Sequence, residues 1–351
     1  MKSLKMKYLK KKKKKDSVMK KNIFVTGGGG FIGSHLLEKL VTLGHKVKTI
    51  VPYNIDNSWG WIDNFPNEIK QNIEVISGDI CDPSSILKES KNIEIFFHLA
   101  ALISIPYSYK SPQSYISTNI NGTVNLLEAA KNDKTELFVQ TSTSEVYGSA
   151  QFIPITEEHP LSAQSPYAAT KIAGDQLALS YFKAFNLPSL ILRPFNTYGP
   201  RQSLRAFIPS ITTQILQSKN KIKLGNLDSR RDFTYVSDTV DGYISAIGNK
   251  KCIGETIQLG TGIDFSMKET LEKIKKLTNP NIEIIQDKER MRPIKSEVNR
   301  LISSNKKAKK ILNWSPKYSG KKGFEKGLKK TVNWFGNSNN LIHYKSDLYN
   351  L

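Results

Sequence analysis

The sequence predicts an α/β protein built on a doubly wound parallel sheet, with a smaller α/β lobe towards its C-terminus. The first observation behind this prediction is a glycine-rich turn, "TGGGGFIG", which follows an apolar run and opens a helical pattern. The second is the repeated alternation of continuous apolar runs with helical segments, which is typical of parallel strands covered on both faces. The third is size, because 351 residues with 38% hydrophobic content can bury a core of this extent.

The predicted elements follow one another in a regular order. Residues 22–51 read as a strand, the glycine turn, a helix, a stop at Gly44 and a second strand, which together make a βαβ unit. Further strands are expected within 73–80, 93–102, 137–144 and 189–196, and helices at about 83–90, 112–131 and 166–185. This order is the Rossmann arrangement, in which ligands bind at the carboxyl ends of the strands.

The rhythm changes after Asn196. Residues 198–220 read as a loop and a helix, 230–247 as a short strand and a helix, and 256–262 as another strand. We therefore expect a dinucleotide-binding domain at 19–196 with a returning segment at about 233–262, and a smaller substrate-binding lobe at 197–232 and 263–351.

The formal net charge of +21 is partly local, since residues 1–18 carry nine lysines and Asp16. We expect this basic extension to be disordered and interpret it as a misassigned start or an appended segment, with a polyanion-binding tail as the alternative. Lysines elsewhere are spread without a groove-reading motif, which argues against a nucleic-acid partner. An anionic nucleotide substrate would favour a positive body equally.

Other signals bear on the compartment. No run approaches the ~18 apolar residues of a membrane span. Cys81 and Cys252 lie far apart and outside any metal-ligand spacing, and no secretory signal pattern is visible. We therefore expect a cytoplasmic protein without a metal, a disulfide or a membrane partner.

The glycine-rich turn has the context of a dinucleotide-binding site. Gly27 permits the tight turn, Gly30 lets the backbone approach a pyrophosphate, and Gly33 lets the helix lie against the sheet. The helix N-terminus adds free N–H groups and a partial positive charge. The sequence therefore predicts that a dinucleotide binds at this turn.

The strand ends bear on which dinucleotide binds. An acid at the end of the second strand would bind the ribose 2′-hydroxyl of NAD, but Val51 stands there, and no arginine beside it signals a 2′-phosphate. Asp79 and Ile80, after the third strand, are placed to border the adenine. We expect NAD, with NADP open.

Five motifs together resemble the extended short-chain dehydrogenase/reductases: "TGGGGFIG", "TNINGT" with Asn119, "TSTSEVYG", "YAATK" and "RPFNTYGPRQ". The resemblance runs from residue 19 to about residue 334. Within that superfamily, Thr-Ser-Glu followed by Val-Tyr-Gly is similar to the nucleotide-sugar 4,6-dehydratases. The stretches "NSWGWID", "RRDFTYVSDTVDGY" and "RPIKSEVNRL" are most similar to the dehydratases of legionaminic-acid synthesis. The resemblance implies conversion of UDP- or GDP-linked N-acetylglucosamine into a 4-keto-6-deoxy sugar.

The implied reaction gives roles to five residues. Tyr167 and Lys171, one helical turn apart, place a phenol and an ammonium on one helix face, and the positive charge favours the phenolate that takes the proton of the C4 hydroxyl. Thr143 shares that proton. Glu145 supplies a carboxylate that can remove the C5 proton. On a strand, residues 143 and 145 would point to the same side, so Glu145 should face the site with Thr143. Some relatives carry aspartate where Ser144 stands here, so protonation of the leaving C6 hydroxyl falls to Ser144, to Glu145 or to water.

The resemblance also implies a set of contact residues. Those expected at the cofactor are Gly27, Gly30, Phe31, Ile32, Gly33, Asp79, Ile80, Leu99, Ala100, Ala101, Tyr167 and Lys171. Those expected at the nucleotide sugar are Ser104, Tyr107, Asn196, Arg205, Arg231 and Arg292, the arginines because guanidinium forks suit phosphate. The helices at about 112–131 and 166–185 have long apolar faces, through which we expect a homodimer.

Other functions fit part of the pattern. A nucleotide-sugar 4-epimerase needs no group like Glu145, whereas UDP-glucuronate decarboxylases share the Ser-Glu pair. A catalytically idle nucleotide-binding protein would survive loss of the Tyr167 hydroxyl, and a nucleic-acid binder would act through residues 1–18. The dehydratase interpretation requires that the Glu145 carboxylate face the pocket and is not locked in a structural ion pair.

Overall fold

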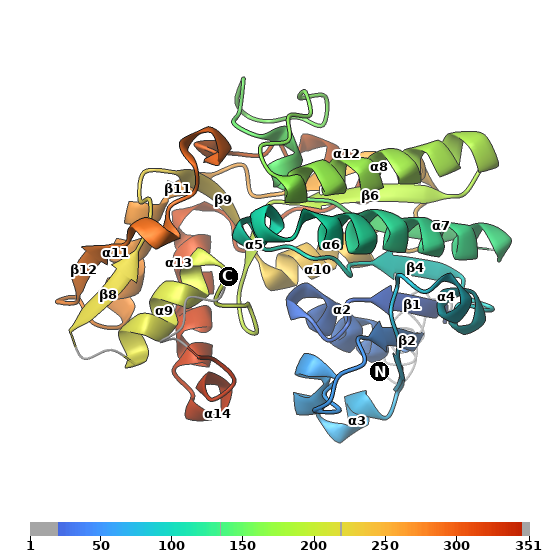
Figure 1. Cartoon of the computed structure of the whole chain (residues 1–351), viewed down its shortest axis with the longest axis horizontal. Helices are drawn as coiled ribbons and strands as arrows, with labels where there is room; N and C mark the ends of the chain where they lie inside the picture. Colours follow the sequence, from blue (N-terminus) through green and yellow to red (C-terminus); the bar gives the residue numbers. More distant parts are fainter. Residues whose placement is uncertain (1–19, 134, 218–219, 346–351) are drawn as a thin grey trace, which may run out of the picture.

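A computed structural model describes residues 20–133, 135–217 and 220–345, so the extension predicted at residues 1–18 lies outside the described residues. The larger part of the fold is a parallel sheet with the strand order β3-β2-β1-β4-β5-β6-β10 (Figure 1). Its strands are β1 (Asn22–Thr26), β2 (Lys46–Val51), β3 (Ile73–Ser77), β4 (Ile95–His98), β5 (Leu137–Thr141), β6 (Ser189–Pro194) and β10 (Thr256–Leu259). The predicted doubly wound sheet is confirmed.

Helices cover both faces of this sheet, and the side chains of β1 show why. Ile23 and Val25 point into the core cluster that contains Leu36, Leu37 and Leu40, whereas Phe24 points into the opposite one. The first face carries α2 (Phe31–Thr42) and α10 (Val236–Ile244), and the second carries α4 (Pro83–Glu89), α7 (Gly122–Asn132) and α8 (Pro166–Phe185). Burial on both faces is what the continuous apolar strands require.

The helix expected at 112–131 is divided by a π-helical turn. It consists of α6 (Pro112–Ile116), the turn η2 (Ser117–Asn121) and α7, and it follows α5 (Ile105–Lys110). Such turns place one extra residue in a helix and often occur at functional sites. Here the turn contains the buried side chain of Asn119.

The smaller lobe lies on the left of Figure 1 and contains two further sheets. The first has β7 (Asn196–Tyr198), β9 (Arg230–Tyr235), β11 (Asp264–Ser266) and β13 (Arg300–Leu301), and the second has β8 (Lys221–Leu224) and β12 (Glu283–Gln286). The remaining helices of the described residues are α3 (Asn67–Lys70), α9 (Phe207–Gln217), α11 (Met267–Leu277), α12 (Lys306–Leu312), α13 (Gly320–Phe335) and α14 (Ser338–Leu341). Short 3₁₀ turns are η1 (Gly60–Asn64), η3 (Ser144–Tyr147), η4 (Lys250–Cys252), η5 (Lys288–Arg290) and η6 (Ile294–Ser296).

The chain passes between the lobes at several connections, and two of them lead to the site. β7 directly follows β6 yet pairs with β9 in the smaller lobe, and α10 directly follows β9 yet packs on α2 in the larger one. The chain therefore crosses at the carboxyl end of β6, the edge at which a doubly wound fold binds ligands.

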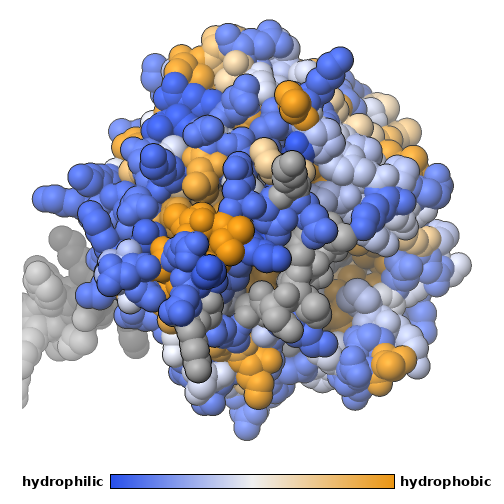
Figure 2. Space-filling view, turned by 60° about the vertical axis from the view of Figure 1, so that its left-hand side comes forward, coloured by the Kyte–Doolittle hydropathy of each residue, from blue (hydrophilic) through white to orange (hydrophobic). Residues whose placement is uncertain are grey.

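The face of the smaller lobe that Figure 2 brings forward is mostly hydrophilic, with separate hydrophobic patches. Among the described residues, no helix has the length and the apolar character that a membrane span needs.

Candidate active site

In the glycine turn between β1 and α2, a Cβ atom would clash with the backbone at Gly27 and Gly33. Gly27 has φ +75°, and a Cβ atom on Gly33 would lie 2.1 Å from the Gly27 carbonyl oxygen. Gly30 is the N-cap of α2, and no side chain caps the helix there. The N–H groups of the first turn, at Phe31, Ile32 and Gly33, are thus left for a ligand, and these residues fit the pyrophosphate of a dinucleotide.

A buried histidine fixes the strand end beside this turn. His98, at the end of β4, contacts Thr26 Oγ1 through Nδ1 at 2.8 Å and Thr123 Oγ1 through Nε2 at 3.0 Å. Because the Thr123 hydroxyl donates to the Asn119 carbonyl oxygen, Nε2 of His98 must carry the proton. Thr26 Oγ1 in turn accepts the N–H of Ala100, which holds the predicted cofactor segment 99–101 against Gly27.

The end of β2 carries no acid, as the sequence indicated, and an aromatic loop lies there instead. Val51 is buried, and the N–H of Trp61 donates to the Gly29 carbonyl oxygen at 3.0 Å. The loop that contains Trp59 and Trp61 therefore lies directly against the glycine turn. Of the two residues predicted at the adenine, Asp79 is exposed and Ile80 is buried against α7.

Glu145 is not on a strand tip, so the period-two argument for its direction is wrong. β5 ends at Thr141, and residues 144–147 form the 3₁₀ turn η3, with Thr143 as its N-cap. Thr143 Oγ1 accepts a hydrogen bond from the Glu145 N–H at 3.3 Å. The side chains of Thr143 and Glu145 are brought together by this capped turn. The prediction had placed them together through the alternation of a strand.

Tyr167 and Lys171 lie on α8 and are both buried, at 8% and 5% exposure. Burial is the largest influence on the phenol and raises the pKa of Tyr167, while a hydrogen bond with Thr143 lowers this pKa and the charge of Glu145 raises it. The Lys171 ammonium donates to the Thr141 carbonyl oxygen at 2.6 Å, and burial lowers the pKa of Lys171 to about 8. The lowering of the phenol pKa expected from Lys171 is therefore not the main influence here.

A buried polar network under these residues was not found from the sequence. The Asp175 carboxylate accepts hydrogen bonds from Ser142 Oγ at 2.6 Å and from Nη2 of Arg193 at 2.9 Å. Arg193 also donates to the Tyr147 hydroxyl at 2.9 Å. The network ties α8 to β5 and η3, the elements that carry Tyr167 and Glu145. Its only sequence signal is the pair of charged residues inside otherwise buried elements.

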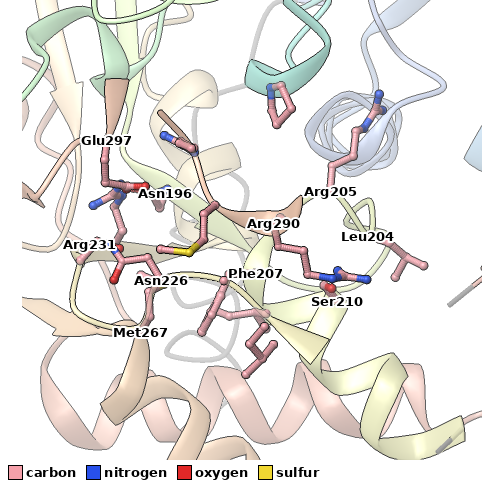
Figure 3. A pocket seen from close by; sticks show the side chains of 18 of the residues that line it. Asn196, Leu204, Arg205, Phe207, Ser210, Asn226, Arg231, Met267, Arg290 and Glu297 are labelled. Atoms are coloured by element: carbon pink, nitrogen blue, oxygen red, sulfur yellow. The ribbon is translucent and has the colours of Figure 1, made fainter. Parts of the chain in front are cut away.

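A cavity of about 460 Å³ opens at the carboxyl end of the sheet, between the two lobes. Four predicted substrate residues line it, namely Asn196, Arg205, Arg231 and Arg292. In Figure 3 Arg231 and Glu297 lie at one end, whereas Arg205 and Leu204 lie at the other. Two further predicted residues, Ser104 and Tyr107, are not part of this lining, although Pro106, Tyr109 and Lys110 of the same helix are.

Ser104 has a different contact from the one predicted. Its hydroxyl caps α5 by accepting the Tyr107 N–H at 3.4 Å, and its carbonyl accepts the Tyr115 hydroxyl at 2.5 Å. The Tyr115 ring lies between those of Tyr107 and Tyr167. In this structure Ser104 therefore positions α5 beside the phenol.

Several cavity residues could not be identified from single motifs. They include Phe207 of α9, Met267 of α11, the backbone around Gly225, and Lys223, Asn226 and Arg290. They come from segments that are far apart in sequence and that meet only in the folded lobe. The apolar members give the cavity a surface for a ring, and the basic members one for phosphate.

The Glu145 carboxylate faces the arginines of this cavity. Oε2 of Glu145 lies 3.7 Å from Nη1 of Arg292, and the side chains are 12% and 27% exposed. Glu145 also acts electrostatically on Arg231, which pairs with Glu297 at 3.6 Å. The ion pair with Arg292 is longer than a hydrogen bond, and its cation lines the cavity. Glu145 therefore lies within ion-pair distance of an arginine that lines the cavity. The residues that line it do not themselves include Thr143, Glu145, Tyr167 or Lys171.

The fold and the site define the class of protein: an NAD-dependent nucleotide-sugar protein of the extended short-chain dehydrogenase/reductase type. More particularly, the chain belongs to the GDP-mannose 4,6 dehydratase family, whose model matches residues 24–328.

The chain is similar to proteins with three different activities. It is 34% identical over 322 residues to a UDP-N-acetyl-α-D-glucosaminuronate decarboxylase from Bacillus cytotoxicus, covering 89% of this chain and 96% of that protein. It is 32% identical over 320 residues to a UDP-glucose 4-epimerase from Mycolicibacterium smegmatis, covering 89% and 98%. The crystal structure of a dTDP-glucose 4,6-dehydratase from Streptomyces venezuelae, with NAD bound, matches with a TM-score of 0.79 at 26% identity, covering 90% and 96%.

These similarities confirm NAD as the predicted cofactor and the nucleotide-sugar dehydratase, epimerase and decarboxylase superfamily as the predicted group. The three named reactions differ, so the similarities alone do not distinguish between them. Within the part of the chain that the structure describes, no group of three or more His, Cys, Asp or Glu side chains is arranged to hold a metal ion.

Proposed function

We propose that this chain is an NAD-dependent nucleotide-sugar 4,6-dehydratase, a hydro-lyase that forms a 4-keto-6-deoxy sugar. The observation that carries the proposal is the position of Glu145. This carboxylate lies close enough to Tyr167 to influence its pKa, and close enough to Arg292 to pair with it. It therefore lies between the proposed base for C4 oxidation and a basic residue of the cavity.

In the first step the Tyr167 hydroxyl, once ionised, takes the proton of the sugar C4 hydroxyl, and Thr143 helps to position that hydroxyl. The glycine turn would hold NAD, which would supply the redox chemistry by taking up a hydride from C4 and later returning it to C6. Lys171 keeps its charge near the phenol and fixes the end of β5 through Thr141. General acid-base help of this kind contributes about a hundred- to ten-thousandfold in rate.

In the second step Glu145 removes the C5 proton, which the new C4 ketone has made acidic. The same carboxyl then gives this proton to the departing C6 hydroxyl, so that one molecule of water leaves. Ser144 is buried at 3% exposure, and we assign it a supporting contact to the leaving hydroxyl and no proton of its own. When hydride is added at C6, C5 takes up a proton. The proton that Tyr167 took from the C4 hydroxyl supplies it, so the number of protons is conserved.

Mass spectrometry tests this proposal. The protein is incubated with NAD and with UDP- or GDP-linked N-acetylglucosamine, and the product should be lighter than the substrate by one water. A product of unchanged mass would support 4-epimerisation. Absence of any product from all nucleotide hexoses would refute the proposal.

One observation favours a second candidate. Arg292 already pairs with a carboxylate in this structure, and a substrate with a carboxylate at C6 could take the place of Glu145. The similarity to a decarboxylase points the same way. Incubation with UDP-glucuronate would then release carbon dioxide, whereas the dehydratase should not use this substrate.

Two finer assignments complete the proposal. The resemblance of "NSWGWID" and "RPIKSEVNRL" supports N-acetylglucosamine as the hexose and a place in legionaminic-acid synthesis. α7 and α8 pack side by side on one face of the sheet, which supports a homodimer through their outer faces. Light scattering on the purified protein measures the oligomeric state directly.

A further inference from the structure

The ion pair between Glu145 and Arg292 joins two residues with separate tasks in the proposed reaction. Glu145 acts on the sugar, whereas Arg292 lines the cavity in which the nucleotide would lie. An oxygen that lies beside the Arg292 cation has to leave it before it can reach a hydrogen of the sugar. The paired state therefore opposes the task of Glu145.

The bonding of Arg292 is incomplete. Its Nη1 atom is buried and has no hydrogen-bond partner, and the distance of 3.7 Å to Glu145 is too long to supply one. A buried donor without a partner is uncommon and costly. A phosphate oxygen in the cavity would give this donor a charge-assisted hydrogen bond, which the carboxylate does not provide.

The polar and charged groups that face Glu145 come from three elements. Tyr167 faces it from α8, Arg231 from β9, and Arg292 from the segment after η5, while Glu297 pairs with Arg231. Two arginines and two carboxylates balance one another in this group. A diphosphate would add two negative charges at the arginines, so it competes with Glu145 for the same cations.

The chain shortly after Arg292 is attached to the larger lobe. Ser296 Oγ donates to the Gln164 carbonyl oxygen and contacts the Tyr109 hydroxyl, each at 2.5 Å. Gln164 Nε2 donates to the Lys295 carbonyl oxygen at 3.0 Å. These contacts attach residues 295–296 to the larger lobe.

We propose that the diphosphate of the nucleotide sugar and the Glu145 carboxylate compete for Arg292, so that seating the nucleotide releases Glu145 from its ion pair. Arg292 is then a positioning residue for the base as well as a phosphate contact. The role of Glu145 as a base rests on the proposed function, but the competition itself does not. Elimination at C5 is thereby coupled to occupation of the nucleotide end of the cavity.

Calorimetry on the full chain with NAD bound tests the competition without any sugar. UDP, GDP and dTDP are titrated into the wild type, Glu145→Gln, Arg292→Gln and the double variant. Glu145→Gln should tighten binding of the preferred diphosphate by roughly two- to fivefold, the range of a partly exposed ion pair. Arg292→Gln should weaken binding, and the addition of Glu145→Gln should then change nothing.

A matched control separates the pair from a general change of charge. Glu283 is an exposed carboxylate of the smaller lobe outside the cavity lining, and Glu283→Gln should leave the affinity unchanged. Equal tightening by Glu145→Gln in both backgrounds, no tightening in the wild-type background, or no binding of any of the three diphosphates would overturn the proposal. If Glu145→Gln does not fold, Glu145→Ala gives the same comparison. Diphosphate binding as predicted, with no dehydrated product from any hexose, would refute the proposed function alone.

Discussion

Thr143 Oγ1 accepts the N–H of Glu145 at 3.3 Å, and the same hydroxyl forms a hydrogen bond with the Tyr167 phenol. One short side chain thus connects the residue proposed to oxidise C4 with the residue proposed to remove the C5 proton. The connection explains how Glu145 from η3 and Tyr167 from α8 can act on neighbouring carbons of one sugar.

Tyr167→Phe should reduce the turnover number by about a hundred- to ten-thousandfold, because the proton acceptor for the C4 hydroxyl is lost. Binding of NAD, measured by calorimetry, should persist, since the phenol is only one of many contacts. A variant with unchanged turnover would exclude Tyr167 as the base.

Gly33→Ala should abolish NAD binding and destabilise the protein. Its Cβ atom would lie 2.1 Å from the Gly27 carbonyl oxygen, a backbone atom that cannot move without opening the turn. Gly336→Ala is the matched control, because its nearest contact would be at 3.4 Å and its φ is −71°. Calorimetric titration of NAD into both variants decides the matter, and equal affinities would contradict the placement of the cofactor.

Lys171→Met should make the cofactor-free protein more stable at pH 7 while it lowers activity. Burial lowers the pKa of Lys171 from 10.5 to about 8, so below pH 8 the folded protein bears the full cost of a buried charge. Between pH 8 and 10.5 the folded chain loses this proton before the unfolded chain does, and the free energy of unfolding of the wild type rises. Urea denaturation should therefore show a stability difference that narrows over this range. A constant difference would contradict the prediction.

His98 should make the protein sensitive to acid. Burial lowers the pKa of His98 from 6.5 to about 3, so the unfolded chain binds a proton that the folded chain does not as the pH falls through this range. The stability is complete above pH 6.5 and is then lost, with a slope that approaches about 1.4 kcal/mol per pH unit for one group. His98→Gln should flatten the curve of unfolding free energy against pH by this amount. Parallel curves for the variant and the wild type would show that His98 titrates normally.

Much of this site followed from local sequence. The glycine turn and the Tyr167 to Lys171 spacing are set by short-range geometry, so their structure could be predicted from a few adjacent residues. The direction of Glu145 could not be derived in this way. It depends on whether the chain continues as a strand or turns after Thr143, and this choice is made by the hydroxyl that caps the turn.

Contacts between segments far apart in the sequence could not be predicted from it. Arg292 was predicted at phosphate, but its pairing with Glu145 needs the segment after η5 to pack across from η3. The tryptophans at 59 and 61 had no assigned role, and the structure places their loop on Gly29. The missing acid at Val51 was visible in the sequence, whereas the aromatic loop beside it required the fold.

Glu145→Gln tests the central claim most directly, with Glu283→Gln, an exposed carboxylate of the smaller lobe, as the control. Each is incubated with NAD and nucleotide-linked N-acetylglucosamine, and product mass and cofactor absorbance are followed together. The dehydratase assignment predicts that the wild type and Glu283→Gln lose one water per sugar, whereas Glu145→Gln oxidises C4, accumulates reduced cofactor and loses no water. Loss of water at the wild-type rate in Glu145→Gln would contradict it.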